Sequence, residues 1–119
     1  MKVILDANFL VDAVKFGIDL NKDLAGNEVF VTDSIVFELE KIIKGSSMDS
    51  GLARIALIYV KAKGLKILKP KERNTDSSLV EYAKKGYAIA THDKELKKRI
   101  KKVKGKVIFI RQKRYLVFE

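Results

Sequence analysis

The chain contains 119 residues, no cysteine and a single histidine, and 47% of its residues are hydrophobic. A chain of this length suits one domain, here residues 1–119, that buries about two-thirds of the surface exposed in its unfolded state. The composition excludes disulfides, thiolate zinc sites and histidine-rich metal centres, so any metal ion must be held by oxygen atoms. We expect a cytoplasmic protein with no signal peptide, no membrane-spanning segment and no membrane partner.

The net charge of +10 is concentrated in one part of the chain. The segment from Lys94 to Arg114 holds eleven basic residues and one acid, Glu95, which accounts for the whole surplus. A positive face of this kind suits a phosphate backbone. A solvated lysine face is the alternative, but the segment directly follows Asp93, which favours a nucleic-acid partner.

The first half of the chain alternates short apolar runs with amphipathic segments. In order, we expect a strand at residues 2–5, helices at 8–14 and 19–24, a strand at 29–31 and a helix that ends near Gly45. Thr32, Asp33 and Ser34 each offer an N-cap for that last helix.

The second half continues the same alternation after a polar loop at residues 46–51. We expect a helix at 52–62, a strand at 65–68 that Pro70 ends, and a helix at 76–85 capped by Thr75. A strand at 87–91, a basic helix at 94–102, a strand at 107–111 and an edge strand at 115–118 complete the predicted elements.

The predicted strands are continuous apolar runs, and helices separate them along the chain. This pattern is typical of a parallel sheet covered by helices on both faces. The predicted fold class is therefore α/β, as a single three-layer domain with a central parallel sheet of about five strands flanked by helices. In such sheets, ligands bind outside the carboxyl ends of the strands, where the strand order reverses.

Four acidic residues are candidates for a site at that edge. Asp6 and Asp93 follow predicted strands, Asp76 opens a predicted helix, and Glu38 lies one turn inside another. Because the carboxyl ends of parallel strands meet at one edge of the sheet, we expect these carboxylates to converge. Gathered carboxylates repel one another unless a cation neutralises them, and oxygen ligands select Mg²⁺ or Mn²⁺.

Each acid also has a purely structural interpretation. Asp6 and Asp93 are placed to cap the helices that follow them, and Asp76 is placed to complement a helix dipole. Glu38 and Glu40 flank the apolar stripe of their helix on opposite sides at similar angles, so periodicity does not choose between them.

Four neighbouring polar residues have open roles. Asn8 is placed either to hold a metal-bound water or to cap the first helix. Thr91 is either a hydrogen-bond donor to a site carboxylate or an ordinary β-branched strand residue. We expect Asp12 to face solvent, and we expect His92 to point away as a linker residue and not to act as a base.

The motifs resemble those of the PIN-domain nucleases over essentially the whole chain. In order they are Leu5-Asp6-Ala7-Asn8, Phe37-Glu38-Leu39-Glu40, Asp76 with Ala83 seven residues later, and Ala90-Thr91-His92-Asp93. The resemblance implies a parallel five-stranded sheet, four acids gathered around Mg²⁺ or Mn²⁺, endoribonuclease activity and, often, a homodimer. It also implies that the catalytic glutamate is Glu38, with Glu40 turned outward.

Two branches of the family fit the chain. VapC-type toxins have this size and these acids, and the resemblance to them implies an antitoxin partner. The segment 93–100 with Gly105, 107–110 and Arg114-Tyr115 is instead similar to the ribosomal-RNA-processing branch. Either branch implies an RNA substrate, single-stranded or ribosomal. The residues expected to bind its phosphates are Lys97, Lys98, Lys101, Lys102, Arg111 and Arg114.

Two other classes of protein compete with the nuclease hypothesis. A phospho-acceptor receiver domain has this size, but it needs an aspartate after its third strand, where this chain has Lys69-Pro70. A non-catalytic RNA-binding module of the same fold is the second alternative. Retention of all four acids disfavours it, because without a metal they would repel the phosphate backbone.

Overall fold

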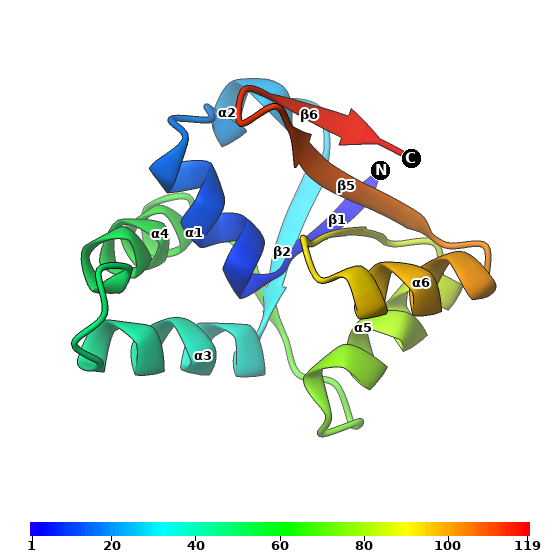
Figure 1. Ribbon diagram of the computed structural model, residues 1–119. Helices are drawn as coiled ribbons and strands as arrows, with labels where there is room; N and C mark the ends of the chain where they lie inside the picture. Colours follow the sequence, from blue (N-terminus) through cyan, green and yellow to red (C-terminus); the bar gives the residue numbers. More distant parts are fainter.

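A six-stranded sheet forms the middle layer of the protein, which a computed structural model describes over all residues, 1–119 (Figure 1). The strands are β1 (Lys2–Leu5), β2 (Glu28–Thr32), β3 (Lys66–Leu68), β4 (Ala88–Ala90), β5 (Lys106–Arg111) and β6 (Tyr115–Phe118). The helices are α1 (Ala7–Lys15), α2 (Leu20–Asp23), α3 (Asp33–Lys44), α4 (Ser50–Ala62), α5 (Thr75–Lys84) and α6 (Lys94–Lys102).

The strand order in the sheet is β3-β2-β1-β4-β5-β6. The first five strands pair in parallel, and β6 pairs with β5 in antiparallel orientation at the edge. The order reverses between β1 and β4, because the chain first builds outward from β1 through β2 to β3 and then returns to the other side of β1. The predicted α/β class and three-layer arrangement are confirmed, with the expected last edge strand as the sixth.

The helices cover the two faces of the sheet as two groups (Figure 1). Helices α1, α3 and α4 pack against one another on one face, and α5 and α6 pack together on the other. The central strands β1 and β4 are therefore enclosed on both sides: Val3, Ile4 and Leu5 have no exposed surface, and Ala88, Ile89 and Ala90 have none either. Their continuous apolar sequences follow from this double burial.

The start of three helices differs slightly from the sequence-based expectation. Helix α1 begins at Ala7 because the Asp6 carboxylate accepts a hydrogen bond from the Ala7 N–H. Helix α5 is capped by Asn74, whose side chain accepts from the Ser77 N–H, so the prediction of Thr75 as the cap is wrong by one residue. Helix α4 begins at Ser50, inside the predicted loop.

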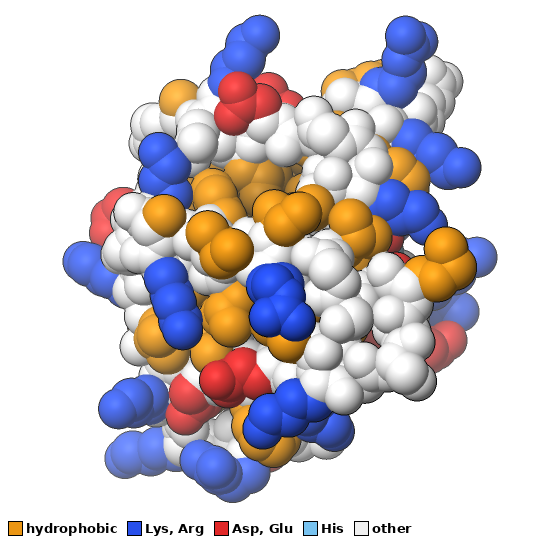
Figure 2. All heavy atoms as spheres, turned by 90° about the vertical axis from the view of Figure 1, so that its left-hand side faces the viewer, with side chains coloured by type: hydrophobic (Ala, Val, Ile, Leu, Met, Phe, Trp, Pro, Cys, Tyr) orange, Lys and Arg blue, Asp and Glu red, His pale blue; other side chains and the backbone are white.

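The outer face of the helical layer formed by α1, α3 and α4 carries apolar side chains among lysines and arginines (Figure 2). On α4, Ile55 and Ile58 are 53% and 59% exposed. No helix of the protein combines the length and the apolar character needed to cross a bilayer.

Candidate active site

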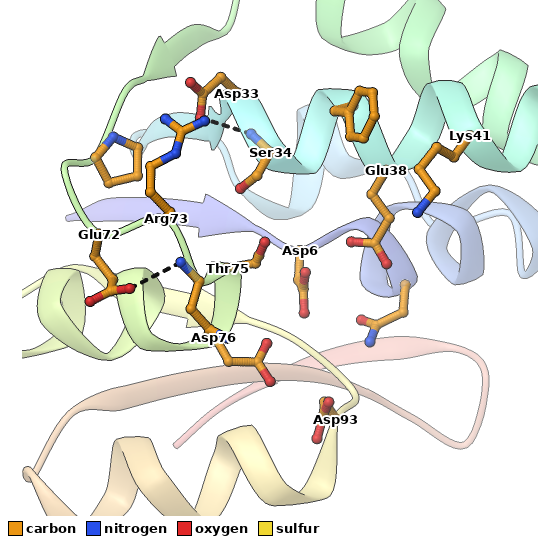
Figure 3. Close-up of a pocket in the computed structure, with 14 residues that line it drawn as sticks. Asp6, Asp33, Ser34, Glu38, Lys41, Glu72, Arg73, Thr75, Asp76 and Asp93 are labelled. Atoms are coloured by element: carbon orange, nitrogen blue, oxygen red, sulfur yellow. Dashed lines mark hydrogen bonds between the residues drawn. The ribbon is translucent and has the colours of Figure 1, made fainter.

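A pocket of about 680 Å³ lies at the carboxyl ends of the central strands and brings all four candidate acids together. Figure 3 shows the carboxylates of Asp6, Glu38, Asp76 and Asp93 directed toward a common space between α3, α5 and α6. The remaining residues that line the pocket are Asn8, Asp33, Ser34, Phe37, Lys41, Pro70, Glu72, Arg73, Asn74 and Thr75.

Asp6 forms the floor of this pocket, and only 6% of its surface is exposed. The pairing of β1 with β4 places it, since Leu5 is in register with Ala90 and the Asp6 N–H donates to the Ala90 carbonyl. The residue that follows β4, the fully buried Thr91, then lies beside Asp6, and its hydroxyl donates to Asp6 Oδ2 at 2.8 Å. Of the two roles left open for Thr91, the structure shows the hydrogen bond to a site carboxylate, and this bond orients Asp6.

Burial raises the pKa of Asp6 to about 6. The hydrogen bonds from Thr91 and from the Ala7 N–H oppose this shift, because both favour the charged form of the carboxylate. The negative charges of Glu38 and Asp76 raise the pKa of Asp6 further. The Asp6 carboxylate is thus held near two other acids in a poorly solvated place.

The other acids are coupled to one another through the same pocket. Partial burial raises the pKa of Glu38, and the charge of Asp76 adds to that rise, whereas Lys41 opposes it. Partial burial also raises the pKa of Asp76, and the charge of Asp93 adds to the rise. An electrostatic chain therefore links all four acids, and Glu38, not Glu40, lines the pocket.

Helix N-termini help to hold this much negative charge in one place. Helix α1 begins after Asp6, α5 after Asn74 and α6 after Asp93, and the first two residues of α3 also line the pocket. Asp93 caps α6, with its Oδ1 accepting from the Leu96 N–H at 3.1 Å. The positive ends of four helix dipoles therefore face the carboxylates. Asp6 and Asp93 therefore each cap a helix and also line the pocket.

His92 does not line the pocket, in agreement with the expectation that it points away from the site, but its ring is held by the fold and is not that of a free linker residue. Its Nε2 accepts from the Ile110 N–H at 3.2 Å, so its proton lies on Nδ1, which donates to the Asp12 carboxylate at 2.6 Å. The His92 backbone N–H donates to the Asn8 side chain at 3.3 Å. Asp12 thus pairs with His92 instead of facing solvent alone. Both ring nitrogens of His92 are occupied, and this residue ties α1 to β5 beside the pocket.

Asn8 lies at the pocket but does not cap α1, a role that Asp6 fills. Its side-chain oxygen accepts from the His92 N–H, so its amide group is held at the pocket wall. The capping role that the sequence left open for Asn8 is therefore wrong, and its other role, holding a metal-bound water, stays a prediction.

The six residues expected to bind phosphates differ in how far their side chains are engaged within the protein, and Arg111 lies over the same Phe109 ring as Lys97. Lys97 lies 4.1 Å from the centre of the Phe109 ring, and Lys101 contacts the Glu119 carboxylate, so both turn toward β5 and β6. The other four, all exposed, are Lys98, Lys102, Arg111 and Arg114. Helix α6 therefore does not present its lysines as a single stripe.

Sequence reasoning did not single out several residues at or near the pocket, among them Arg99, Phe37, Lys41 and Arg73. Arg99 donates to Ser77 Oγ at 3.0 Å and opposes the rise in the pKa of Asp76. Phe37, Lys41 and Arg73 line the pocket itself. A signal for Lys41 was present, because it lies three residues after Glu38 on the same helix. No local sequence pattern indicates Arg73, which lies in the segment between β3 and α5 and reaches the pocket through the path of that segment.

The donor chemistry of the pocket fits Mg²⁺ or Mn²⁺, because carboxylates and amide oxygens are the ligands these ions prefer. No three His, Cys, Asp or Glu side chains lie close enough together in this structure to chelate an ion by themselves. Mg²⁺ usually retains several waters and takes one or two carboxylates together with substrate phosphates, so a dense cluster of protein ligands is not required.

The sequence matches the profile of the PIN-like domain family over residues 3–113. The chain therefore belongs to the PIN-like domain family. Among its curated relatives is the ribonuclease VapC4 of Methanocaldococcus jannaschii, which is 30% identical over 123 aligned residues covering 96% of this chain and 93% of the relative. Among solved structures, the PIN domain endonuclease Utp24 superposes with a TM-score of 0.81, at 27% identity, over 99% of this chain and 90% of that one.

Proposed function

We propose that the protein is a divalent-metal-dependent endoribonuclease that hydrolyses phosphodiester bonds of RNA. The observation that carries this proposal is the gathering of Asp6, Glu38, Asp76 and Asp93 in the lining of one pocket at the carboxyl ends of the central strands. Four carboxylates on separate elements are costly to gather without a cation. The ribonuclease and endonuclease activities of the two relatives named above support the same reaction class.

In this proposal, Asp6, Glu38, Asp76 and Asp93 hold Mg²⁺ or Mn²⁺, directly or through water. The bound ion would neutralise phosphate charge and lower the pKa of a water molecule for attack on phosphorus. Thr91 keeps Asp6 oriented through the hydroxyl bond, and Asn8 offers its amide to water or to a phosphate oxygen at the pocket wall. The basic residues of α6 and of the β5–β6 hairpin provide attraction for the RNA backbone.

The two relatives support two cellular roles for this activity. As a VapC-type toxin, the protein would act in the cytoplasm with an antitoxin protein as partner. As an rRNA-processing nuclease, it would act on ribosomal RNA. A homodimer is compatible with either role.

A non-catalytic RNA-binding module of the PIN fold is the second candidate. The observation in its favour is that no three acidic or histidine side chains form a ready-made chelating group. Such a module would bind RNA through its basic residues and would bind divalent ions weakly.

The first prediction separates these two functions. Purified protein in millimolar Mn²⁺ is expected to cleave a labelled single-stranded RNA. Chelation of the ion should abolish cleavage. A variant with Asp6→Asn, Glu38→Gln, Asp76→Asn and Asp93→Asn should retain the fold, measured by circular dichroism, but lose cleavage. Equal cleavage by this variant and the wild type would show that the activity does not come from this pocket.

A further inference from the structure

Phe37 is an exposed aromatic residue at the edge of a charged pocket. Its side chain is 62% exposed, and it is the only aromatic residue among those that line the pocket. It lines the same pocket as Glu38, the residue that follows it on α3, and so lies at the rim of the proposed reaction centre. The rest of the lining, apart from Pro70, is polar or charged.

Lys41 accompanies the Phe37 ring. It lies four residues later on α3, on the same side of the helix, and its Nζ is 5.8 Å from the centre of the ring. Lys41 also lines the pocket, and its charge opposes the rise in the pKa of Glu38. Figure 3 shows the Lys41 side chain beside that of Glu38. An aromatic face and an ammonium group are therefore presented together at the pocket.

This combination matches one nucleotide of single-stranded RNA. Every base has a π-face that stacks on an aromatic side chain, and each nucleotide brings one phosphate for a nearby cation. A protein partner would instead call for a continuous apolar surface, but exposed charged residues, among them Glu38, Glu40 and Lys41, surround Phe37 on α3. The exposed isoleucines at 55 and 58 belong to a different helix, α4.

We propose, building on the endoribonuclease function above, that Phe37 and Lys41 bind one unpaired nucleotide next to the scissile phosphate. The base stacks on the Phe37 ring, and its phosphate lies against the Lys41 ammonium group. Because a base held in a duplex cannot present its face to Phe37, this contact selects single-stranded RNA. Phe37 is thus a specificity-determining residue and not part of the group that acts on the phosphate.

The test compares Phe37→Ala, Phe37→Trp and the matched control Ile58→Ala, which removes a similarly exposed apolar side chain that does not line the pocket. Binding of a fluorescent single-stranded RNA is measured by anisotropy in Ca²⁺, and cleavage is measured in Mn²⁺. Phe37→Ala should weaken binding and raise KM by roughly 10- to 100-fold, the range of one base–aromatic stack. The cleavage rate at saturating RNA should stay the same, and Phe37→Trp and Ile58→Ala should behave like wild type.

Abasic RNA provides the decisive comparison. A single abasic nucleotide is moved along the RNA around the mapped cleavage site. At one position it should weaken binding to wild type as much as Phe37→Ala does, and it should have no further effect on the Phe37→Ala protein. Additive losses at every position, or unchanged binding by Phe37→Ala, would overturn the proposal. A change in oligomeric mass with Phe37→Ala, without loss of RNA affinity, would assign the residue to a protein interface instead.

Lys41 is tested through salt dependence. Lys41→Ala should reduce the slope of log Kd against log salt by about 0.7, the value for one phosphate contact on a single strand. Lys44→Ala, on the same helix but outside the pocket lining, should leave the slope closer to that of wild type. If the wild type binds RNA in this nucleotide-dependent way but does not cleave it in Mn²⁺, the catalytic proposal fails while the nucleotide site stands.

Discussion

Asp6 shows how one residue serves the fold and the candidate site together. Its Oδ1 caps α1 and its Oδ2 accepts the Thr91 hydroxyl, so both carboxylate oxygens are used within the protein. These bonds favour the charged form, yet burial and neighbouring acids outweigh them and raise the pKa to about 6. Hydrogen bonds therefore fix the position of the Asp6 carboxylate, but without a metal ion its negative charge is energetically unfavourable there.

This balance predicts a pH-dependent effect of Asp6→Asn on stability. The folded protein holds the Asp6 proton more tightly than the unfolded chain, whose aspartate has a pKa near 3.8. The contribution of Asp6 to the free energy of unfolding therefore falls as the pH rises from about 4 to about 6, by on the order of 3 kcal/mol. Asn lacks this penalty and retains capping ability. The variant should match wild type near pH 4 and exceed it at pH 7.5, measured by urea unfolding without divalent ions.

A loss of stability upon Asp6→Asn at pH 7.5 would contradict this prediction. That outcome would mean that the hydrogen bonds of the Asp6 carboxylate contribute more than burial and charge repulsion cost. Cleavage should be abolished in either case if the proposed function is correct.

Among the elements, helix α6 divides its basic residues between two tasks. On one flank, Lys97 lies over the Phe109 ring and Lys101 contacts Glu119, which fastens the helix to β5 and to the end of the chain. Glu119 responds to this surrounding charge, because Lys101, Lys97 and Arg111 all lower its pKa. Lys98 and Lys102 are exposed, and Lys98 has only a loose 3.7 Å contact with Glu95.

Paired substitutions on α6 should separate these tasks. The double change Lys98→Ala and Lys102→Ala should reduce the salt slope of single-stranded RNA binding by about 1.4 and leave the melting temperature within 2 °C or so of wild type. The double change Lys97→Ala and Lys101→Ala should lower the melting temperature and reduce the slope less, because Glu119 already neutralises part of that flank. Equal slopes for the two double variants would show that both flanks contact RNA alike.

At the scale of the whole molecule, the candidate site exists only where four elements meet. Asp6 comes from the end of β1, Glu38 from α3, Asp76 from α5 and Asp93 from the start of α6. The reversal of strand order between β1 and β4 opens the sheet edge at this point, and ligands of α/β sheets bind at such reversals. An ion bound here would connect elements from both helical layers.

Divalent ions should therefore stabilise the wild-type fold. An ion that binds only the native state raises the free energy of unfolding by about 2.7 kcal/mol at 100 times its Kd, which corresponds to a rise in melting temperature of several degrees. The effect should weaken as the pH falls through about 6, because a proton then competes for Asp6. Thermal melts in Mn²⁺ between pH 5 and pH 8, with Asp6→Asn as the reference, measure this directly. A rise of equal size in Asp6→Asn would place the ion elsewhere.

Much of the architecture could be read from local sequence patterns. Apolar runs such as Val3 to Leu5 predict buried parallel strands, and the acids that follow them predict a site at the carboxyl edge. These features are short-range, since periodicity and capping depend on residues within a few positions of one another. The predicted cap of α5, Thr75, is likewise only one residue from the observed cap, Asn74.

Other features depend on contacts between distant parts of the chain. Periodicity left Glu38 and Glu40 equivalent, and the choice of Glu38 rested on the family resemblance until the packing of α3 against its neighbours placed Glu38 in the pocket lining. His92 was expected to point away from the site, and it does not line the pocket, but the contacts that fix its ring come from Asp12 and the Ile110 backbone, both remote in sequence. The sequence by itself thus determined the elements, the fold class and the candidate acids. The tertiary structure decided which side chains face one another, because register and packing bring together residues whose local surroundings are alike.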